Sequence, residues 1–421
     1  MSAHDTIYGL LGEHLGHSFS PFLHHALGDE AYRLYELPEQ ELEAFVKQEN
    51  VGGLNVTIPY KEKVLPFAEE LSPAVKAIGA ANTLYRRDGK LIAENTDVLG
   101  FLDLLESGGI EVSGKKVLVF GNGGACRAVL EALCRKNAGE VLVVSRRGGD
   151  TPLISYDELP DHRDADVVVN TTPVGMYPDN LSSVTDLSRF EHLSGVIDIV
   201  YNPLRTGLLL QAEDLGIPHA GGLGMLVAQA VRAHEFFFDT KVDDRVIDDL
   251  TAELTRNATN IVLIGMPGSG KTSVAGLLAE RTGRDVVELD SAIEEAAGKP
   301  IPEIFAEDGE DVFRDLESAC IAKAGTKNGA ILSLGGGAVT RERNYLPLHQ
   351  NGRIYCLRRD LSLLATDGRP LSKDLATLKA MEAERAPMYE RFADTTIVND
   401  GTLEDAVEAI LRDFTSANLT S

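Results

Sequence analysis

The feature that most constrains the fold is a glycine-rich loop that follows an apolar stretch and precedes a helix-compatible one. Residues 265–272 are Gly-Met-Pro-Gly-Ser-Gly-Lys-Thr, and the apolar run Ile261–Ile264 comes directly before them. In this context the glycines allow backbone N–H groups to turn inward around phosphates, and the start of the following helix adds its dipole. The pattern predicts a nucleoside triphosphate site on a parallel α/β sheet.

Two side chains of this loop have the chemistry that triphosphate binding requires. Lys271 is expected to reach the β- and γ-phosphates, and the hydroxyl of Thr272 is suited to Mg²⁺. The residues predicted to bind ATP from this loop are Gly265, Gly268, Ser269, Gly270, Lys271 and Thr272.

The acidity of the chain excludes one class of partner and sets a condition on the others. With 65 Asp and Glu against 40 Lys and Arg, the net charge is −25, whereas nucleic-acid binding needs a basic face. Anionic substrates must therefore be held by arginines and lysines placed locally, or by the first turns of helices.

The length of the chain limits the number of domains, and its cysteines indicate the cellular compartment. A chain of 421 residues is expected to form roughly two or three domains. No apolar run approaches the ~20 residues of a membrane-spanning helix, and the start Met1–Asp5 has neither the basic nor the apolar segment of a secretory signal. The four cysteines are scattered and are expected to be reduced thiols, so the predicted location is the cytoplasm.

Alternation of apolar runs with helix-compatible stretches predicts an α/β chain with three domains. Strands are expected at Lys116–Phe120, Val141–Ser145, Asp166–Asn170 and Val196–Tyr201, which is typical of a doubly wound parallel sheet. The charged stretch Asp239–Thr259 is helix-compatible and lacks the Pro, Gly and Ser of a flexible tether. The predicted domains are residues 1–97, completed by helices at about 225–255, then residues 98–224 and residues 258–421.

A second glycine-rich turn predicts a dinucleotide site of the Rossmann type in the middle domain. Gly121, Gly123 and Cys126 occupy the three positions of a GxGxxG fingerprint after an apolar strand. The next strand ends in Ser145-Arg146-Arg147 and not in the carboxylate that would hold the ribose 2′-hydroxyl of NAD. Two arginines favour a 2′-phosphate, so NADP is predicted over NAD; the alternative for these arginines is a solvated loop.

Five further segments of the last domain form an ordered pattern: Glu288-Leu-Asp290, Phe313-Arg314, Gly335-Gly336-Gly337, Gly368-Arg369-Pro370 and Arg385–Tyr389. In order and spacing they resemble the shikimate kinase family over residues 260–414, which implies a P-loop fold of the nucleoside-monophosphate-kinase type. The resemblance implies that Asp290 binds the substrate hydroxyls and acts as base, and that Arg314 and Arg385 hold the substrate carboxylate. It implies that Gly335, Gly336 and Gly337 let the backbone approach the substrate.

The same resemblance places Arg369 in a lid, residues 358–373, that closes over the transferred phosphoryl group and over ATP. One position departs from the family. Where the family has Asp-x-Asp, this chain has Glu288, which leaves open whether this residue supports Mg²⁺ through water.

The first half carries its own ordered blocks, at residues 16–21, 55–62, 82–83, 95–97, 170–176, 198–203 and 222–229. In this order they resemble the shikimate dehydrogenase family, from residue 6 to about residue 240. The resemblance implies that Lys61, paired with Asp97, delivers a proton to the ketone while NADPH reduces it. It assigns the substrate carboxylate to Ser18, Ser20 and Tyr201, the hydroxyls to Asn55, Thr57, Asn82 and Gln229, and NADP to Gly121, Asn122, Gly123, Gly124, Ala125, Ser145, Arg146, Arg147, Thr171, Gly222 and Met225.

Together the two resemblances imply a bifunctional enzyme of aromatic amino-acid synthesis that makes shikimate and then phosphorylates it. Two alternatives stay open: the first half acts on quinate, or one half is a non-catalytic regulatory module. Ser18 and Ser20 argue against quinate, and the presence of Lys61, Asp97 and Lys271 argues against a degenerate half. The expected ligands are small molecules with NADP(H), ATP and Mg²⁺, without nucleic acid or membrane, and a homo-oligomer stays open.

A histidine cluster near the start of the chain invites a metal interpretation. His14, His17, His24 and His25 lie close together in the sequence. They have no cysteine or carboxylate partner at zinc-site spacing, so a metal site is not predicted there.

Overall fold

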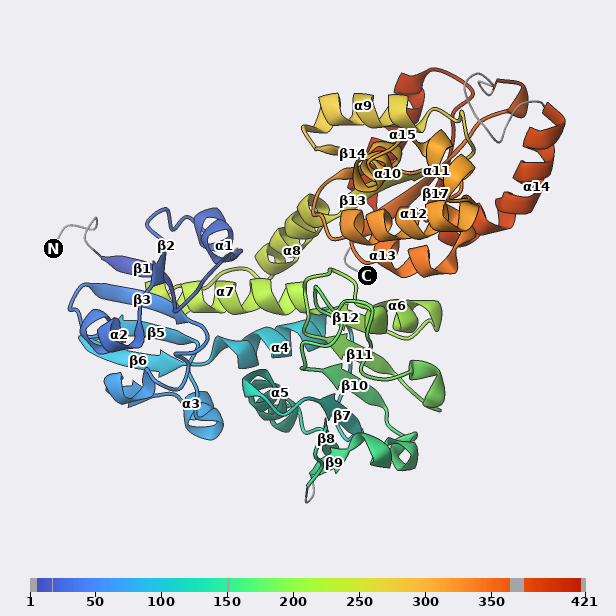
Figure 1. Ribbon diagram of the computed structural model, residues 1–421. Coiled ribbons are helices and arrows are strands. Elements are labelled where there is room, and N and C mark those ends of the chain that lie inside the picture. Colours follow the sequence, from blue (N-terminus) through green and yellow to red (C-terminus); the bar gives the residue numbers. More distant parts are fainter. Residues whose placement is uncertain (1–5, 17, 150–151, 364–374, 418–421) are drawn as a thin grey trace.

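The computed structural model describes residues 6–16, 18–149, 152–363 and 375–417 (Figure 1). Its strands form three separate sheets, drawn from blue through green to orange, and each sheet uses one continuous stretch of the chain. The whole described chain is therefore α/β. Short 3₁₀ helices cover Leu65–Phe67, Tyr156–His162, Leu187–Arg189, Ala338–Thr340, Glu342–Asn344 and Leu361–Leu363.

The first sheet is mixed, in the order β2-β1-β3-β5-β6-β4. β1 pairs in parallel with β2 and β3, whereas β5 runs antiparallel to both β3 and β6. Its strands are β1 (Ile7–Gly12), β2 (Arg33–Glu36), β3 (Val51–Val56), β4 (Glu70–Leu71), β5 (Thr83–Arg87) and β6 (Lys90–Glu94), with helices α1 (Ser20–Ala26), α2 (Glu39–Val46) and α3 (Pro73–Ile78).

The second sheet is the doubly wound parallel sheet that the sequence predicts, in the order β12-β11-β10-β7-β8-β9. Its central strands are buried apolar runs because helices and loops cover both faces. The elements are α4 (Thr96–Ser107), β7 (Val117–Phe120), α5 (Gly124–Arg135), β8 (Val141–Ser145), β9 (Leu153–Ser155), β10 (Val167–Asn170), β11 (Gly195–Asp198), α6 (Gly207–Asp214) and β12 (His219–Gly221).

The third sheet is parallel, in the order β14-β15-β13-β16-β17. Strand β13 lies at its centre and leads into the glycine-rich loop, as the P-loop pattern predicts. The elements are β13 (Asn260–Ile264), α9 (Lys271–Thr282), β14 (Val286–Glu288), α10 (Leu289–Ala297), α11 (Ile301–Glu307), α12 (Glu310–Gly325), β15 (Ile331–Ser333), α13 (Tyr345–His349), β16 (Gly352–Arg358), α14 (Leu375–Phe392), β17 (Thr395–Val398) and α15 (Leu403–Ser416).

A long helix, α7 (Gly222–Phe238), joins the first two sheets (Figure 1). It leaves β12 of the second sheet, packs along α4, and ends against β3 and β5 of the first sheet. The next helix, α8 (Arg245–Ala258), packs on α7 and leads directly into β13. The connection predicted over residues 239–259 is thus helical only from residue 245, and Asp239, directly after α7, has a left-handed conformation.

Three of the expected strands are shorter than the sequence suggested. β7 and β10 each start one residue late, at Val117 and Val167, and β11 ends at Asp198, not at Tyr201. The difference at the end of β11 has a physical cause, because the Asp198 carboxylate accepts hydrogen bonds from the backbone N–H of Val200 at 3.0 Å and from the Thr206 hydroxyl at 2.6 Å. These bonds turn the chain away from the sheet. The predicted division into three domains stays a prediction, and the three sheets are consistent with it.

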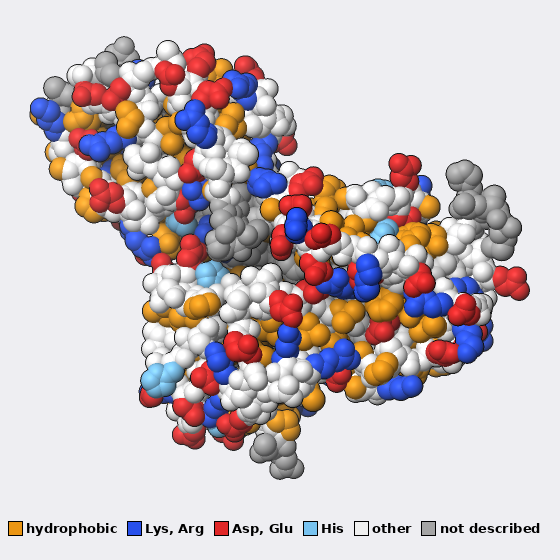
Figure 2. All heavy atoms as spheres, turned by 180° about the vertical axis from the view of Figure 1, so that it is seen from behind, with side chains coloured by type: hydrophobic (Ala, Val, Ile, Leu, Met, Phe, Trp, Pro, Cys, Tyr) orange, Lys and Arg blue, Asp and Glu red, His pale blue; other side chains and the backbone are white. Residues whose placement is uncertain are grey.

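Charge is mixed over the face that Figure 2 shows, where Lys and Arg side chains are interspersed with Asp and Glu. In the described part of the chain, none of the helices combines the length and the apolar character needed to cross a lipid bilayer.

The packing of α7 on β3 generates a stability prediction. A Cβ added at Gly53 would lie 2.3 Å from the ring of Phe237, so Gly53→Ala should cost about 1–3 kcal/mol by overpacking. Differential scanning calorimetry should show a lower melting temperature. Gly276→Ala is the control, since a Cβ there meets nothing within 4 Å on an exposed helix and should not destabilise. Unchanged melting of Gly53→Ala would contradict this packing.

Candidate active sites

The first candidate site is a cavity of about 260 Å³ between the first and second sheets. All nine residues predicted to bind the substrate of the first half line it: Ser18, Ser20, Asn55, Thr57, Lys61, Asn82, Asp97, Tyr201 and Gln229. They come from the start of α1, the end of β3 and the turn after it, the residue before β5, the start of α4, the loop after β11, and α7. Residues far apart in the sequence therefore meet where α7 bridges the two sheets.

A lysine–carboxylate pair lies in this cavity. The Lys61 ammonium is 2.6 Å from the Asp97 carboxylate, and the other carboxylate oxygen accepts a hydrogen bond from the Asn82 amide at 2.9 Å. Asn82 is itself fixed, because its Oδ1 accepts from the Thr96 N–H at 2.7 Å. The Lys61 side chain is one-third exposed, so its ammonium can reach a ligand in the cavity.

Tyr32 supports the site from behind and was missed by sequence reasoning. Its hydroxyl donates to Asn55 Oδ1 at 2.7 Å, and its fully buried ring stacks on His24 at a centroid distance of 3.8 Å. The hydrogen bond fixes the orientation of the Asn55 amide. Tyr32 lies before β2, outside every block that carries the resemblance in the first half, so only the fold brings it to the site.

The predicted dinucleotide loop lies at the carboxyl end of β7. Gly121 has a φ of 105°, and a Cβ there would lie 2.8 Å from the Thr171 hydroxyl, so this turn requires glycine. A Cβ at Gly123 or Gly124 would meet nothing within 4 Å, which leaves the N-terminus of α5 open for a pyrophosphate. Cys126, at the third glycine position, is fully buried in the helix–sheet core.

Two arginines follow β8, where a dinucleotide fold reads the ribose. Arg146 and Arg147 are exposed, and among the described residues neither forms an ion pair with a carboxylate. Their guanidinium groups fit a 2′-phosphate. Three other predicted NADP residues, Ala125, Gly222 and Met225, line the cavity beside the substrate set.

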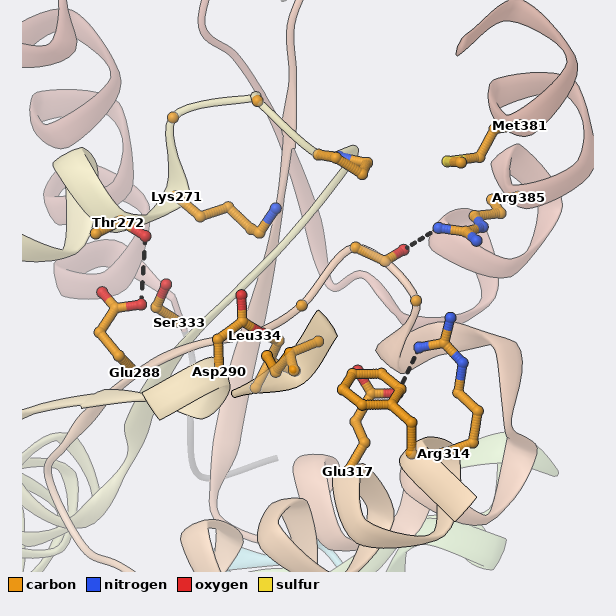
Figure 3. Close-up of a pocket in the computed structure, with 18 of the residues that line it drawn as sticks. Lys271, Thr272, Glu288, Asp290, Arg314, Glu317, Ser333, Leu334, Met381 and Arg385 are labelled. Atoms are coloured by element: carbon orange, nitrogen blue, oxygen red, sulfur yellow. Dashed lines mark hydrogen bonds and ion pairs between the residues drawn. The ribbon is translucent and has the colours of Figure 1, made fainter. Parts of the chain in front are cut away.

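The second candidate site is a cavity of about 450 Å³ in the third part of the chain (Figure 3). Figure 3 shows the Lys271 side chain extending from the glycine loop into this cavity. Its ammonium donates to the carbonyl oxygens of Gly265 at 2.9 Å and Met266 at 3.1 Å. Gly268 and Gly270 take φ values of 86° and 95°, which shape the loop for phosphate. Ser269 is fully buried, and its carbonyl accepts from the Asn399 amide at 2.7 Å.

Oxygen donors for a divalent cation lie beside the loop. The Thr272 hydroxyl donates to Glu288 at 3.3 Å, and both residues line the cavity. A hydroxyl and a carboxylate form a donor set that suits Mg²⁺. Strand β14 ends at Glu288, and Asp290 lies in the first turn of α10 with its carboxylate toward the cavity (Figure 3). In the described residues no group of three or more His, Cys, Asp or Glu is arranged to hold a metal ion.

Two buried arginines converge on the opposite side of this cavity (Figure 3). Arg385 donates to the carbonyl of Gly336 at 2.9 Å, and Arg314 is only 5% exposed. A Cβ at Gly337 would lie 2.1 Å from the Arg314 guanidinium. The triple glycine therefore makes room for the arginine, in addition to the close approach of substrate that the sequence suggested.

Sequence reasoning missed Glu317, which is 1% exposed and 2.8 Å from Arg314. Burial raises the pKa of Glu317, although Arg314 opposes the shift, and among the described residues its Oε1 has no hydrogen-bond partner. The i,i+3 spacing from Arg314 on one helix was the available signal. The predicted catalytic residue Arg369 and most of the predicted lid lie outside the described residues, whereas Arg359 lines the cavity.

Comparison with known families gives three matches to sequence models. The shikimate kinase model matches residues 267–415, and the model of the shikimate dehydrogenase substrate binding domain matches residues 10–84. The model of an IstB-like ATP binding protein matches residues 224–289, which include the glycine loop.

Curated relatives and solved structures match the first half. The chain is 38% identical to a shikimate dehydrogenase (NADP(+)) of Clostridium perfringens, over 59% of this chain and 98% of that protein. A chorismate mutase/shikimate 5-dehydrogenase fusion protein from Clostridium acetobutylicum is 37% identical, with a TM-score of 0.56 over 59% of this chain and 97% of that one. A shikimate 5-dehydrogenase from Thermus thermophilus, in complex with NADP(H) and shikimate, is 32% identical, with a TM-score of 0.52 over 58% of this chain and 98% of that one.

The buried histidine behind the first cavity generates a pH prediction. Burial, helped by the neighbouring His234, lowers the pKa of His24 from 6.5 to about 3. As the pH falls, His24 therefore takes up a proton in the unfolded chain before it does so in the folded chain. The contribution of neutral His24 to the free energy of unfolding is complete above pH 6.5 and is lost as the pH drops toward 3. Below pH 6.5 the free energy of unfolding of His24→Phe should fall less steeply than that of the unaltered chain. The difference between the two slopes should reach up to about 1.4 kcal/mol per pH unit.

Urea unfolding at a series of pH values between 7 and 5, roughly the range in which histidine titrates, measures this slope. His192→Gln is the matched control, because His192 is exposed and its replacement should leave the slope unchanged. Equal slopes for His24→Phe and the unaltered chain would show that His24 does not titrate in this way.

Proposed function

The chain belongs to the shikimate dehydrogenase family, and its residues 267–415 match the shikimate kinase model. From these two matches we propose that it is a bifunctional enzyme of the shikimate pathway. Its first half reduces 3-dehydroshikimate to shikimate with NADPH. Its second half transfers the γ-phosphoryl group of ATP to shikimate. The observation that carries this proposal is the presence of two separate cavities, each lined by its own expected set of polar residues.

In the first cavity the chain's residues orient the ketone and deliver a proton. NADPH supplies the hydride when bound. As the ketone oxygen becomes an alkoxide it needs a proton, and Lys61 Nζ donates it while Asp97 holds the ammonium in place. General acid catalysis of this kind contributes about 10²–10⁴-fold to the rate. Ser18, Ser20 and Tyr201 bind the substrate carboxylate, and Asn55, Thr57, Asn82 and Gln229 bind its hydroxyls.

In the second cavity the residues hold two anions in line and activate one hydroxyl. The glycine loop and Lys271 bind the phosphates of ATP, and Arg314 and Arg385 hold the carboxylate of shikimate. Asp290 accepts the proton of the attacking hydroxyl. Mg²⁺ would neutralise phosphate charge, held by Thr272 and, through water, by Glu288. Arg369 is proposed to stabilise the transferred phosphoryl group.

A coupled assay on the purified chain tests both steps at once. With 3-dehydroshikimate, NADPH, ATP and Mg²⁺ present, NADPH should be consumed first and ADP should follow. Shikimate with ATP alone should also give ADP. Loss of NADPH without ADP would refute the kinase half, and activity with dehydroquinate in place of 3-dehydroshikimate would move the first half to the quinate alternative.

The separation of the two cavities predicts that each activity can be removed alone. Lys61→Ala should lower kcat for ketone reduction by about 10²-fold or more and leave kinase turnover unchanged. Lys271→Ala should do the reverse. Lys63→Ala is the control, because Lys63 forms a surface ion pair with Glu39. If either cavity variant lost both activities while its melting temperature stayed the same, two independent sites would be excluded.

Arg146 and Arg147, which follow β8, should determine the preference for NADPH over NADH. Removing both in Arg146→Ala/Arg147→Ala should raise the KM for NADPH by about tenfold or more, since hydrogen bonds to charged groups contribute about 1.5–3 kcal/mol. The KM for NADH should change little. Steady-state kinetics with both nucleotides measures the ratio, and Arg135→Ala, at the far end of α5, is the control for the loss of an arginine away from the nucleotide loop. Equal effects on NADPH and NADH would remove these residues from 2′-phosphate recognition.

A further inference from the structure

A pair of buried amide side chains joins the third sheet to the second. Gln350 and Asn351 lie in the turn between α13 and β16 and are 0% and 2% exposed. Turns are normally solvated, and burying an amide costs free energy unless it is hydrogen-bonded. In Figure 1 the end of α13 lies next to α6, so this turn is covered by the second part of the chain.

The amides are satisfied by residues of the second part. The backbone N–H of Leu204 donates to Asn351 Oδ1 at 2.8 Å, and that of Arg205 donates to the backbone carbonyl of Gln350 at 2.9 Å. The Arg205 guanidinium donates to the Gly352 carbonyl at 2.9 Å. These three bonds hold one short segment, residues 199–206, which runs from β11 to α6.

A neighbouring loop is held by the same two amides. Gln350 Nε2 donates to the Asn180 carbonyl at 2.7 Å, and the Asn180 amide donates back to Gln350 Oε1. Asn351 Nδ2 donates to the Tyr177 hydroxyl at 3.1 Å, and that hydroxyl donates to the Gly325 carbonyl at 3.2 Å. The backbone N–H of Tyr177 in turn donates to Asn202 at 3.3 Å, which ties this loop to the 199–206 segment.

The other end of the 199–206 segment lines the dehydrogenase cavity. Ile199 and Tyr201 are both lining residues, and Tyr201 lies three residues before Leu204. The Leu204 side chain packs into the cluster that α7 and α8 form, and α7 carries Gln229 of the same cavity. The segment thus contacts the dehydrogenase substrate site at one end and the kinase part at the other.

We propose that the kinase part, residues 260–417, is a built-in docking partner of the dehydrogenase part and positions Tyr201 through the 199–206 segment. This inference rests on the proposed dehydrogenase function. Without the kinase part, the N–H groups of Leu204 and Arg205 lose these fixed acceptors and are hydrated by water instead, so these bonds no longer hold the segment in one conformation. The segment would then adopt another conformation and carry Tyr201 with it. A tether that only joined two enzymes would need α8 alone and no such hydrogen bonds.

The test uses the full chain with the interface weakened from each side. Asn351→Leu keeps the side-chain volume but removes the acceptor of Leu204, and Arg205→Ala removes the contact with Gly352. Each variant should raise the KM for 3-dehydroshikimate by about fivefold or more. The KM for NADPH, and both KM values and kcat of the kinase, should stay within about twofold, since the replaced residues line neither the nucleotide loops nor the kinase cavity.

Matched controls remove a hydrogen bond from the same groups without opening the interface. Asn328→Ala removes the 3.2 Å bond between Asn351 and Asn328 within the kinase part, and Glu213→Ala removes the 3.2 Å ion pair of Arg205. Both should leave all constants unchanged.

Three outcomes decide the matter. An unchanged KM for 3-dehydroshikimate in Asn351→Leu or in Arg205→Ala would overturn the inference, as would an equal loss in the kinase reaction. If Asn351→Leu fails to fold, Arg205→Ala gives the answer from the dehydrogenase side. The unaltered chain is assayed first, and its failure to reduce 3-dehydroshikimate would refute the proposed function. The KM values of the variants are then compared with those of the unaltered chain, and this comparison tests only the inference.

Discussion

Every substrate and nucleotide proposed for this chain is an anion, and the chain itself carries a net charge of −25. The global field therefore opposes binding, and the fold has to concentrate donors where each ligand lies. It does so with two helix N-termini, at α5 and α9, and with side chains brought together at the carboxyl ends of parallel strands. Some acidic residues lie inside the ligand cavities: Asp97 orients Lys61, and Glu317 holds Arg314. Carboxylates thus set the positions of the cations that the anions need.

Much of both sites could be predicted because their residues lie in short blocks next to buried strands. Strands such as β7, β10 and β13 are continuous apolar runs, which is the pattern of a parallel sheet covered on both faces. Loops that follow them carry the polar residues, so strand and site are found together. The mixed first sheet was harder to predict from the sequence, because no distinct sequence pattern marks the antiparallel pairing of β5 with β3 and β6.

What the sequence did not reveal are residues that act through another side chain. Tyr32 reaches Asn55 because β1 pairs with both β2 and β3. Glu317 lies one helical turn after Arg314, and it becomes a residue of the site because α12 is buried on that side. The end of β11 was misplaced for a similar reason, since the Asp198 carboxylate stops the strand through contacts with residues further along the chain. The spacing of Glu317 from Arg314 is a local signal, but the burial that gives Tyr32, Glu317 and Asp198 their roles depends on tertiary packing.

The interface made by Gln350 and Asn351 has a consequence for the order in which the protein matures. During synthesis the dehydrogenase part leaves the ribosome first, and the acceptor of the Leu204 N–H lies 147 residues later in the chain. Until that length has been made, the donors of Leu204 and Arg205 are hydrated by water. The nascent first half can therefore form its sheets early, but the wall of its substrate cavity is completed only when the last part of the polypeptide has folded against it.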